Sequence, residues 1–510
     1  MIRQVNKGSH NQLKVVDIGI NTHQEPVIYM REDCHICRSE GFTSSSRITV
    51  SSSTLSIVAS LNVVDNHVLE QGYVGLSKVA MQRLKPDLNE MVTVGHADVV
   101  SSLTALRKKV FGNTLNYTEL QAIITDISEH LYSDIEISSF LTVCAGGRLL
   151  PDEIIDLTKA MVNAGKSLRW PKYDQVLDKH CIGGIPGNRT TPLVVSIVSA
   201  AGHIMPKTSS RAITSPAGTA DTMETLTEVN LDLSAIQRVV QETGACLCWG
   251  GAVNLSPADD LLIRIERALD LDGEGQLIAS VLSKKIAAGS THTIIDIPVG
   301  DTAKVRNRES AERLANLFTK VGAACGIHVR CIITDGSKPI GSGIGPVEEA
   351  RDLLAIFKRQ QDASQELRER ALLLASHLLD LAENCGLASG LERATSILES
   401  GKAYEQFKRI LSAQGGGKSL PSSRFQHVQP SSKSGTIVAI DNRKLARLAK
   451  LAGAPFTPVS GLRLHSNVGD SVTSQTPLFT LFSDSQGELE YAMSYYNDNT
   501  DIFSISGRLQ

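Results

Sequence analysis

The sequence predicts an α/β protein in which a helical bundle domain accompanies an α/β domain with a largely parallel sheet. Residues 173–335 alternate between strand-like and helix-like segments, the pattern of parallel βαβ units. Residues 99–172 carry successive helical patterns, and residues 1–98 carry short β-branched runs separated by Gly, Asn, Asp and Pro. A chain of 510 residues is also too long for one ordinary core, so several domains are expected.

We expect the chain to divide into six consecutive segments. These are a β-rich N-terminal domain, either a barrel or a sandwich (1–98), the first part of the helical domain (99–172), the α/β domain that binds phosphate and nucleoside (173–335), a helical and α/β continuation (336–413), a linker rich in Gly, Ser and Pro (414–434), and a small α+β C-terminal domain (435–510).

Capping residues indicate where several of the predicted helices begin and end. In the helical domain, Pro151 occupies a first helical position and Gly165 ends that helix. In the α/β domain, Ser256 caps a helix that has Pro257 at its first position. The remaining helices are expected at 190–202, 234–244, 276–288 and 310–326, with strands at 246–251, 291–300 and 329–336 between them. Ligands of such sheets bind at the carboxyl ends of the strands.

Composition argues against nucleic-acid-binding, membrane and disulfide-rich secreted proteins. The net charge is −3, which does not suggest a general nucleic-acid or membrane binder. No apolar run is long enough to span a membrane, and the N-terminus lacks a secretory pattern, so we expect a cytoplasmic protein. Nine cysteines in a chain of this size argue against a disulfide framework, and the CxxC of Cys34 and Cys37 is interpreted as a pair of reduced thiols.

The residues best suited to bind an anion lie between Asp178 and Asp221. Lys179 and His180 precede a GGIPGN turn, which exposes backbone N–H groups at the start of a helix and favours a phosphate. The turn is neither a Walker motif nor a GxGxxG fingerprint, so a purely structural turn stays an alternative. The loop 207–221 is crowded with hydroxyls around Arg211, and it could be a second wall of the same site or a solvated loop.

A second group of polar residues follows on two later helices. Ser280 and Lys284 are spaced i, i+4 and therefore share a helix face, and Arg267 and Asp272 precede them. Lys304 lies in the loop after the strand at 291–300. By spacing alone, scattered surface charge is favoured over a binding site as the explanation of these residues.

The motifs KHCIGGIPGN, KTSSRAITSPAGTAD, LSPADD, QLIASVLSKK and IIDIPVGDTAKV resemble those of the thymidine and pyrimidine-nucleoside phosphorylases. Within this family the chain is most similar to the longer branch that contains the archaeal AMP phosphorylases, over about residues 100–490. The resemblance implies a helical domain and an α/β domain flanking a cleft, and a homodimer or higher homo-oligomer. It also implies phosphorolysis of a nucleoside, with thymidine giving thymine and 2-deoxy-D-ribose 1-phosphate.

The resemblance also implies roles for individual residues. Phosphate would be held by Lys179, Cys181, Gly184, Thr190, Ser209 and Thr219. The catalytic group would be His180, Asp272 as proton donor, Arg267 and Lys284, and the remaining substrate contacts would come from Ser210, Arg211, Ala212, Ile213, Thr214, Ser215, Ser280 and Lys304. No cofactor or metal is expected beyond inorganic phosphate as co-substrate.

The chemistry of phosphorolysis suits these residues. Phosphate attacks C1′ while positive charge grows on the sugar, and the departing base must be neutralised by a histidine near its ordinary pKa of about 6.5 or by a buried acid. Arg267 and Lys284 would stabilise charge on the base oxygens, by about 3 kcal/mol each. Cys181 departs from the family pattern, which has serine there, and a thiol is a weaker donor.

Three other functions are weighed against this one. A nucleoside 5′-monophosphate phosphorylase, giving a base and ribose 1,5-bisphosphate, would need a further cationic pocket built by Arg211 or Lys304. A phosphoribosyltransferase-like enzyme would need an acidic pair for Mg²⁺, which the loops do not obviously supply. A non-catalytic binding protein is favoured only by Cys181.

Overall fold

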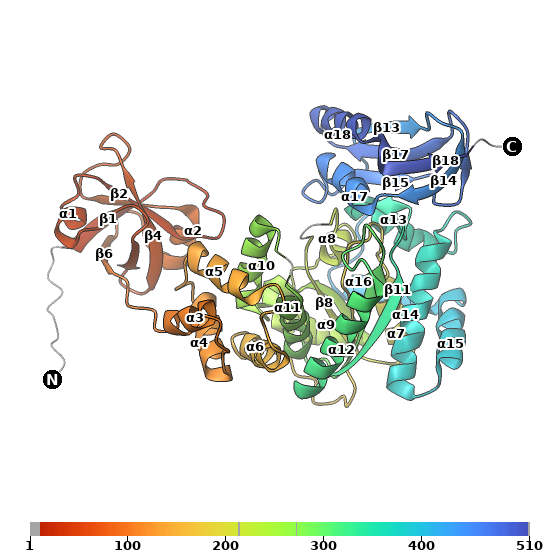
Figure 1. The fold of residues 1–510 in the computed structure, drawn as a ribbon, viewed down its shortest axis with the longest axis horizontal. Helices are drawn as coiled ribbons and strands as arrows, with labels where there is room; N and C mark the ends of the chain where they lie inside the picture. The colour runs from red at the N-terminus through yellow and green to blue at the C-terminus, as the bar shows by residue number, and fades with distance from the viewer. Residues whose placement is uncertain (1–10, 213–214, 272, 508–510) are drawn as a thin grey trace. The chain divides into compact units, whose positions relative to one another are not determined.

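The computed structural model describes residues 11–212, 215–271 and 273–507. The chain forms two compact units, one made of residues 1–108 and 126–139, the other of residues 109–125 and 140–510. Figure 1 traces both along the chain. In the described part of the chain, no helix has the length and apolar character that crossing a membrane requires.

The first unit contains a closed barrel with strand order β1-β5-β2-β4-β3-β6. Apolar side chains such as Leu13, Ile28 and Ile48 fill its core. The sequence left a barrel and a sandwich open, and the structure selects the barrel. The elements are β1 (Gln12–Asp17), β2 (Val27–Arg31), α1 (His35–Glu40), β3 (Arg47–Ser51), β4 (Ser56–Val64), β5 (Tyr73–Leu76), α2 (Lys78–Leu84) and β6 (Met91–His96).

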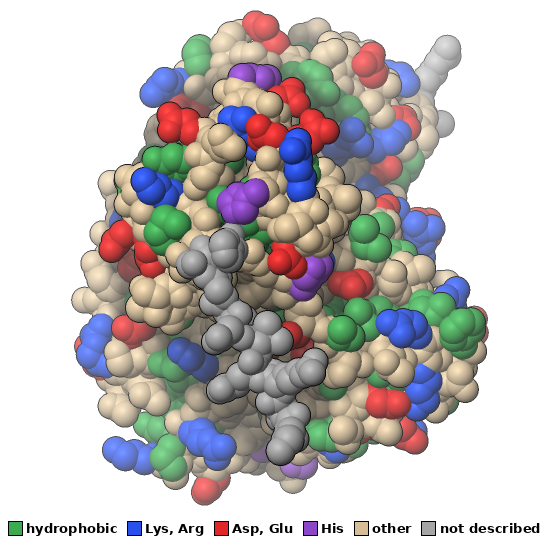
Figure 2. Space-filling view, turned by 90° about the vertical axis from the view of Figure 1, so that its left-hand side faces the viewer, with side chains coloured by type: hydrophobic (Ala, Val, Ile, Leu, Met, Phe, Trp, Pro, Cys, Tyr) green, Lys and Arg blue, Asp and Glu red, His purple; other side chains and the backbone are tan. Residues whose placement is uncertain are grey.

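Acidic and basic side chains are interspersed on the face of the molecule shown in Figure 2. Neither sign of charge forms a continuous field among the described residues of that face. A mixed surface of this kind agrees with the near-neutral net charge of −3.

The helical segment covers α3 (Leu103–Val110), α4 (Tyr117–Ser128), α5 (Asp134–Cys144) and α6 (Pro151–Asn163). Helix α6 begins at Pro151 and places Glu153 in its first turn, where a carboxylate is favoured. The Glu153 carboxylate accepts the backbone N–H of Leu150 at 3.0 Å and that of Leu115 at 2.8 Å. It also pairs with the Lys109 ammonium at 2.7 Å, and both side chains are buried.

The second unit is built on a parallel sheet. Strand β10 (His292–Val299) lies between β11 (His328–Asp335) and β7 (Leu177–Cys181), and β8 (Met205–Ser209) pairs with β9 (Ala245–Trp249). A parallel bridge between Val176 and Ile204 joins the two groups. The order is therefore β11-β10-β7-β8-β9, which confirms the predicted parallel sheet.

Helices cover both faces of this sheet. Figure 1 shows α12 and α14 on opposite sides of β11, and both helices contact the sheet. A large core cluster lies between the sheet and α7, α14, α15 and α16. The helices between β7 and β13 (Phe425–Pro430) are α7 (Thr191–Ala200), α8 (Thr219–Glu224), α9 (Leu233–Thr243), α10 (Pro257–Leu269), α11 (Glu274–Ala287), α12 (Arg308–Ala324), α13 (Pro346–Phe357), α14 (Gln365–Glu383), α15 (Leu387–Glu399) and α16 (Lys402–Ala413).

The C-terminal segment has the predicted α+β composition. Its strands are β14 (Gly435–Ile440), β15 (Gly461–Leu464), β16 (Ser471–Val472), β17 (Pro477–Ser483) and β18 (Phe503–Ser506), with helices α17 (Asn442–Leu451) and α18 (Gln486–Asp498). Two earlier strands, β12 (Gly343–Ile344) and β13 (Phe425–Pro430), pair with β15 and β17. The linker prediction for 414–434 needs correction, because β13 lies inside that segment and pairs with β17. The first four side chains of β13 are exposed, so no apolar alternation marks this strand in the sequence.

Replacing Glu153 with Gln is expected to lower the free energy of unfolding by about 3 kcal/mol, because the Lys109 ammonium would stay buried without a counter-ion. Urea unfolding followed by circular dichroism measures the change. The double variant Lys109→Met, Glu153→Gln removes the buried charge and is expected to recover at least half of the loss. A double variant as unstable as Glu153→Gln alone would contradict this account.

Candidate functional site

The candidate site lies where β7 and β8 end. Counted from the bridge between Val176 and Ile204, Cys181 and Ser209 both lie five residues further along their strands. The register of β7 on β10 places Asp296 opposite Cys181. The carboxyl ends of the central strands thus carry polar side chains at one level of the sheet, where ligands of parallel sheets bind.

Side chains on β7 alternate between the two faces of the sheet, and this separates two kinds of chemistry. Lys179 extends toward the start of α7, where its ammonium donates to Thr190 Oγ1 at 2.6 Å and to Thr191 Oγ1 at 3.3 Å. Asp178 faces the opposite way and pairs with Lys285 on α11. Lys179 and Cys181 therefore share one face, and Asp178 and His180 share the other.

Lys179 is a buried cation that forms no ion pair with any described residue, and the Asp296 carboxylate acts on its pKa only from a longer range. Only 1% of the residue is exposed. Burial lowers the pKa of its ammonium from the ordinary value of 10.5. Because an unpaired buried charge is costly, this position favours an anion as the missing partner.

Two further polar atoms near the strand ends lack partners. Ser209 Oγ and Asp296 Oδ2 are buried and make no hydrogen bond to any described residue. Cys181 Sγ accepts the Asn188 side-chain amide at 3.3 Å. Burial and then the Asp296 charge raise the pKa of the Cys181 thiol to about 12, so it is a neutral thiol near pH 7. An unsatisfied hydroxyl at Ser209 is what a site completed by a ligand requires.

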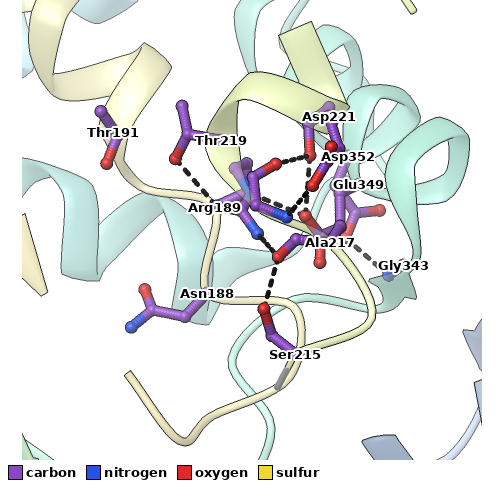
Figure 3. A network of polar contacts seen from close by, with 12 residues as sticks. Asn188, Arg189, Thr191, Ser215, Ala217, Thr219, Asp221, Gly343, Glu349 and Asp352 are labelled. Atoms are coloured by element: carbon purple, nitrogen blue, oxygen red, sulfur yellow. Dashed lines mark hydrogen bonds and ion pairs between the residues drawn. The ribbon is translucent and has the colours of Figure 1, made fainter. Parts of the chain in front are cut away.

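Arg189 fixes the second loop against the first (Figure 3). Its guanidinium donates to Thr219 Oγ1 at 2.8 Å and to the carbonyl oxygen of Ala217 at 2.7 Å. The third bond runs to Glu349 Oε2 at 2.6 Å, and the Glu349 carboxylate is buried. Arg189 adjoins Thr190, so a single residue joins the lysine turn to the hydroxyl-rich loop.

The opposite face of β7 carries a group of lysines around His180. The Asp178 carboxylate is fully buried and pairs with Lys207 at 3.0 Å and with Lys285 at 2.9 Å. Burial lowers the pKa of Lys285 to about 7. Burial and the surrounding lysines, led by Lys285 and Lys207, lower the pKa of His180 well below 6.5.

This result corrects the expectation for His180. A histidine of ordinary pKa would be partly protonated near neutral pH, but cations surround this imidazole and keep it neutral. His180 can therefore donate or accept a hydrogen bond as a neutral ring, and it is not a source of protons at pH 7.

Of the site residues predicted on α10 and α11, Lys284 acts on His180, whereas Arg267 does not contact it among the described residues. Lys284 pairs with the buried Asp259 at 2.7 Å, and its charge acts on His180. Ser280 is partly exposed one turn earlier on the same helix. Arg267 is exposed in the last turn of α10, where burial and the charges of Arg267 and Arg447 lower the pKa of Lys450 in the C-terminal segment. Within the described residues, no contact joins Arg267 to His180.

The loop that follows β8 is held by acidic side chains. Arg211 pairs with Glu224 at 2.5 Å and with Asp221 at 3.2 Å, and its guanidinium lies over the ring of Trp249. The backbone N–H of Ala212 donates to Asp221 Oδ2 at 2.6 Å. The charge of Arg211 is therefore already neutralised by the protein.

Three of the predicted substrate and catalytic residues, Ile213, Thr214 and Asp272, lie outside the described residues. Ser210 and Ser215 are described and lie on either side of residues 213–214. The Ser215 hydroxyl donates to the carbonyl oxygen of Ala217 at 2.9 Å.

Gly184 lies directly against the loop that carries Lys304. A Cβ at Gly184 would come within 2.4 Å of the Lys304 backbone nitrogen, and Gly184 has φ +89°. Any side chain here would be strained and would displace the loop. The glycine turn and the Lys304 loop, which are far apart in sequence, therefore form one part of the site.

Several residues that support the site were not predicted from the sequence. They are Asn188, Arg189, Thr191, Glu349, and the buried carboxylate of Asp178 with its two partners, Lys207 and Lys285. Asp178 and Arg189 adjoin predicted site residues, which was the available signal. Glu349 lies 160 residues beyond Arg189, and no local pattern links the two.

The chain matches two family models. Residues 103–165 match the glycosyl transferase family helical bundle domain, and residues 173–404 match the α/β domain of the same family. The chain is 50% identical over 495 residues to "Putative thymidine phosphorylase 1" of Acidovorax sp. (strain JS42), covering 97% of both chains. It is also 50% identical over 501 residues to "Putative thymidine phosphorylase" of Legionella pneumophila (strain Paris), covering 98% of this chain and 97% of that one.

A solved structure shares the fold at low sequence identity. The anthranilate phosphoribosyltransferase of Saccharomyces cerevisiae in complex with PRPP and Mg aligns with a TM-score of 0.50 at 15% identity, covering 62% of this chain and 98% of that one. This likeness supports the arrangement of helical and α/β domains alone.

Replacing Lys179 with Met is expected to raise the melting temperature of the phosphate-free protein, because it removes an unpaired buried charge. The same variant is expected to lose stabilisation by phosphate, which for the wild-type protein is about 2.7 kcal/mol at 100 times Kd. Differential scanning calorimetry with and without phosphate measures both effects.

Lys109→Met is the matched control, since this lysine has a carboxylate partner. It is expected to lower the melting temperature and to keep the response to phosphate. A Lys179→Met protein that melts earlier and still responds fully to phosphate would contradict the assignment.

Proposed function

Because this chain belongs to the glycosyl transferase family whose helical bundle and α/β domain models it matches, we propose that it is a pentosyltransferase that cleaves pyrimidine nucleosides with inorganic phosphate. The preferred substrate in this proposal is thymidine, which would give thymine and 2-deoxy-D-ribose 1-phosphate. The names of the relatives at about 50% identity support the class of reaction. The observation that carries the proposal is the unpaired, buried ammonium of Lys179 beside Thr190.

In this proposal, phosphate occupies the side of β7 that Lys179 faces. The Lys179 ammonium and the hydroxyls of Thr190 and Ser209 would hold it, and Arg189 would keep Thr219 in place without contacting phosphate itself. Positioning of this kind lowers the entropic part of the barrier, since the nucleophile is already oriented toward C1′.

The reaction then forms a bond from a phosphate oxygen to C1′ and breaks the bond from C1′ to the base nitrogen. The base leaves with the electron pair, and its negative charge would be stabilised on the His180 face of β7 by Lys284 and, in its protonated form below its pKa of about 7, by Lys285. His180 would contribute a neutral N–H donor. The predicted proton donor Asp272 stays a prediction, as do the absence of a cofactor, the homo-oligomer and the cytoplasmic location.

A nucleoside 5′-monophosphate phosphorylase is the second candidate. The close approach of Gly184 to the Lys304 loop favours it, because this contact brings a lysine of the chain beside the glycine turn. Arg211 gives less support to that candidate, since Glu224 and Asp221 already neutralise its charge.

Base release separates these candidates. The protein is incubated with phosphate and thymidine, uridine or AMP, and free base is measured by chromatography. Phosphate-dependent release of thymine supports the proposal, and release of adenine from AMP alone would replace it with the second candidate. Failure with every substrate under conditions in which phosphate binds would favour a non-catalytic protein. A phosphoribosyltransferase would instead require a pyrophosphorylated sugar and Mg²⁺.

The ratio of kcat/KM between wild-type protein and a His180→Gln variant is expected to stay constant between pH 6 and 8. His180 is neutral across this range, because its pKa lies well below 6.5, so no proton is lost from it as pH rises. Titration of phosphate affects both proteins alike and cancels in the ratio. A ratio that falls with rising pH around 6.5 would show that His180 acts as an imidazolium.

Replacing Cys181 with Ser is expected to leave kcat/KM equal or to raise it severalfold. A hydroxyl is a stronger donor than the neutral thiol and still accepts the amide of Asn188. Steady-state assays at varied phosphate test this, with the gain expected in KM for phosphate. A collapse in kcat would mean that the thiol itself takes part in the reaction.

A further inference from the structure

A polar hollow, with a volume of about 620 Å³, lies away from the candidate active site. It is lined by the last residues of α7, the segment after α13 and the first residues of α16. Thr190 precedes the amino end of α7 and Ser199 lies at its carboxyl end, so the length of this ten-residue helix, about 15 Å, separates the two sites. Its volume lies within the range of small-molecule sites.

Four cations line this hollow. They are Lys358, Arg359, Lys402 and Arg409, all of them exposed. Among the residues that the structure describes, none of the four pairs with a carboxylate. The only acidic residue of the lining, Glu405, already pairs with Lys408 at 2.8 Å. In a protein with a net charge of −3, this is a local concentration of uncompensated positive charge.

Nearby cations outside the hollow behave differently. Arg368 pairs with Glu399 at 2.7 Å, and Arg393 pairs with Glu383. Carboxylates are thus available on this part of the surface, but they are used by cations that do not line the hollow. Repulsion among the four unpaired cations is a cost that a bound anion would remove.

Both guanidiniums of the lining are held in position. Arg359 donates to the carbonyl oxygen of Glu399 at 2.6 Å and has φ +55°, a backbone conformation uncommon for arginine. Arg409 donates to Gln406 Oε1 and to the carbonyl oxygen of Glu242, both at 3.0 Å. Gln406 is only 4% exposed and is also bonded to Ser199, so the floor beneath Arg409 is a buried polar network. Groups fixed before binding lose little entropy on binding.

The aromatic residues of the lining are already engaged. The Tyr404 ring stacks on Phe357 with centroids 5.8 Å apart, and the Lys408 ammonium lies 5.0 Å from the Tyr404 centroid. The hollow therefore offers charge and hydrogen-bond donors to a ligand rather than a free stacking surface. Guanidinium and ammonium groups together suit phosphate oxygens.

We propose that this hollow binds a small anion that carries at least two phosphate charges, at a site separate from the candidate active site. Cations that line one hollow of this size lie within roughly one Debye length, about 8 Å at physiological ionic strength, of its centre. They therefore act together on a multiply charged ligand. Binding here does not depend on the proposed phosphorolysis.

Calorimetric titration with inorganic pyrophosphate tests the site, in a Lys179→Met background that removes the ammonium of the other anion site. The test variant is Lys358→Gln, Lys402→Gln. The control is Lys320→Gln, Lys433→Gln, which changes the net charge equally at two exposed lysines outside the lining. Melting temperatures check that each protein is folded. ATP and adenosine serve as further ligands, which separate recognition of phosphate from recognition of a base.

The proposal predicts that pyrophosphate and ATP bind, that adenosine does not, and that the test variant weakens binding at least tenfold while the control changes it less than twofold. No pyrophosphate binding at millimolar concentration would overturn the proposal. Equal weakening in test and control variants, or binding of adenosine as tight as that of ATP, would also overturn it.

Discussion

The candidate site depends on one unbalanced charge, the ammonium of Lys179. It is buried on the central strand β7, and among the described residues only hydroxyls at the start of α7 accept its hydrogen bonds. The surrounding residues do not neutralise this charge. Arg189 pairs with Glu349 and donates a hydrogen bond to Thr219, which holds Thr219 beside the same turn. A dianion at this point would compensate a cost that the unliganded fold carries.

The two faces of β7 carry different side chains and are proposed to have different roles in the reaction. Lys179 and Cys181 face the hydroxyls, whereas Asp178 and His180 face lysines of β8 and α11. Burial first, and then the lysines around the Asp178 carboxylate, lower the pKa of His180 well below 6.5 and favour its neutral ring. The proposed phosphorolysis uses this separation: the nucleophile is held on one side, and negative charge on the leaving base is received on the other.

The sequence predicted whatever is encoded locally. Alternating strands and helices predicted the parallel sheet, and the run from Asp178 to Asp221 contains Lys179, Thr190 and Ser209 within one βαβ unit, with Thr219 at the start of the next helix. It could not predict the pairing of Arg189 with Glu349 across 160 residues, nor strand β13, whose first side chains are exposed. It also misjudged His180, because the pKa depends on lysines brought together only by folding.

A crystal structure of the protein grown with phosphate tests the central claim most directly. The account predicts a phosphate within hydrogen-bonding distance of both Lys179 Nζ and Ser209 Oγ, so that the buried cation and the unsatisfied hydroxyl share one ligand. Phosphate bound elsewhere, with Lys179 still bonded only to Thr190 and Thr191 at saturating concentration, would contradict it.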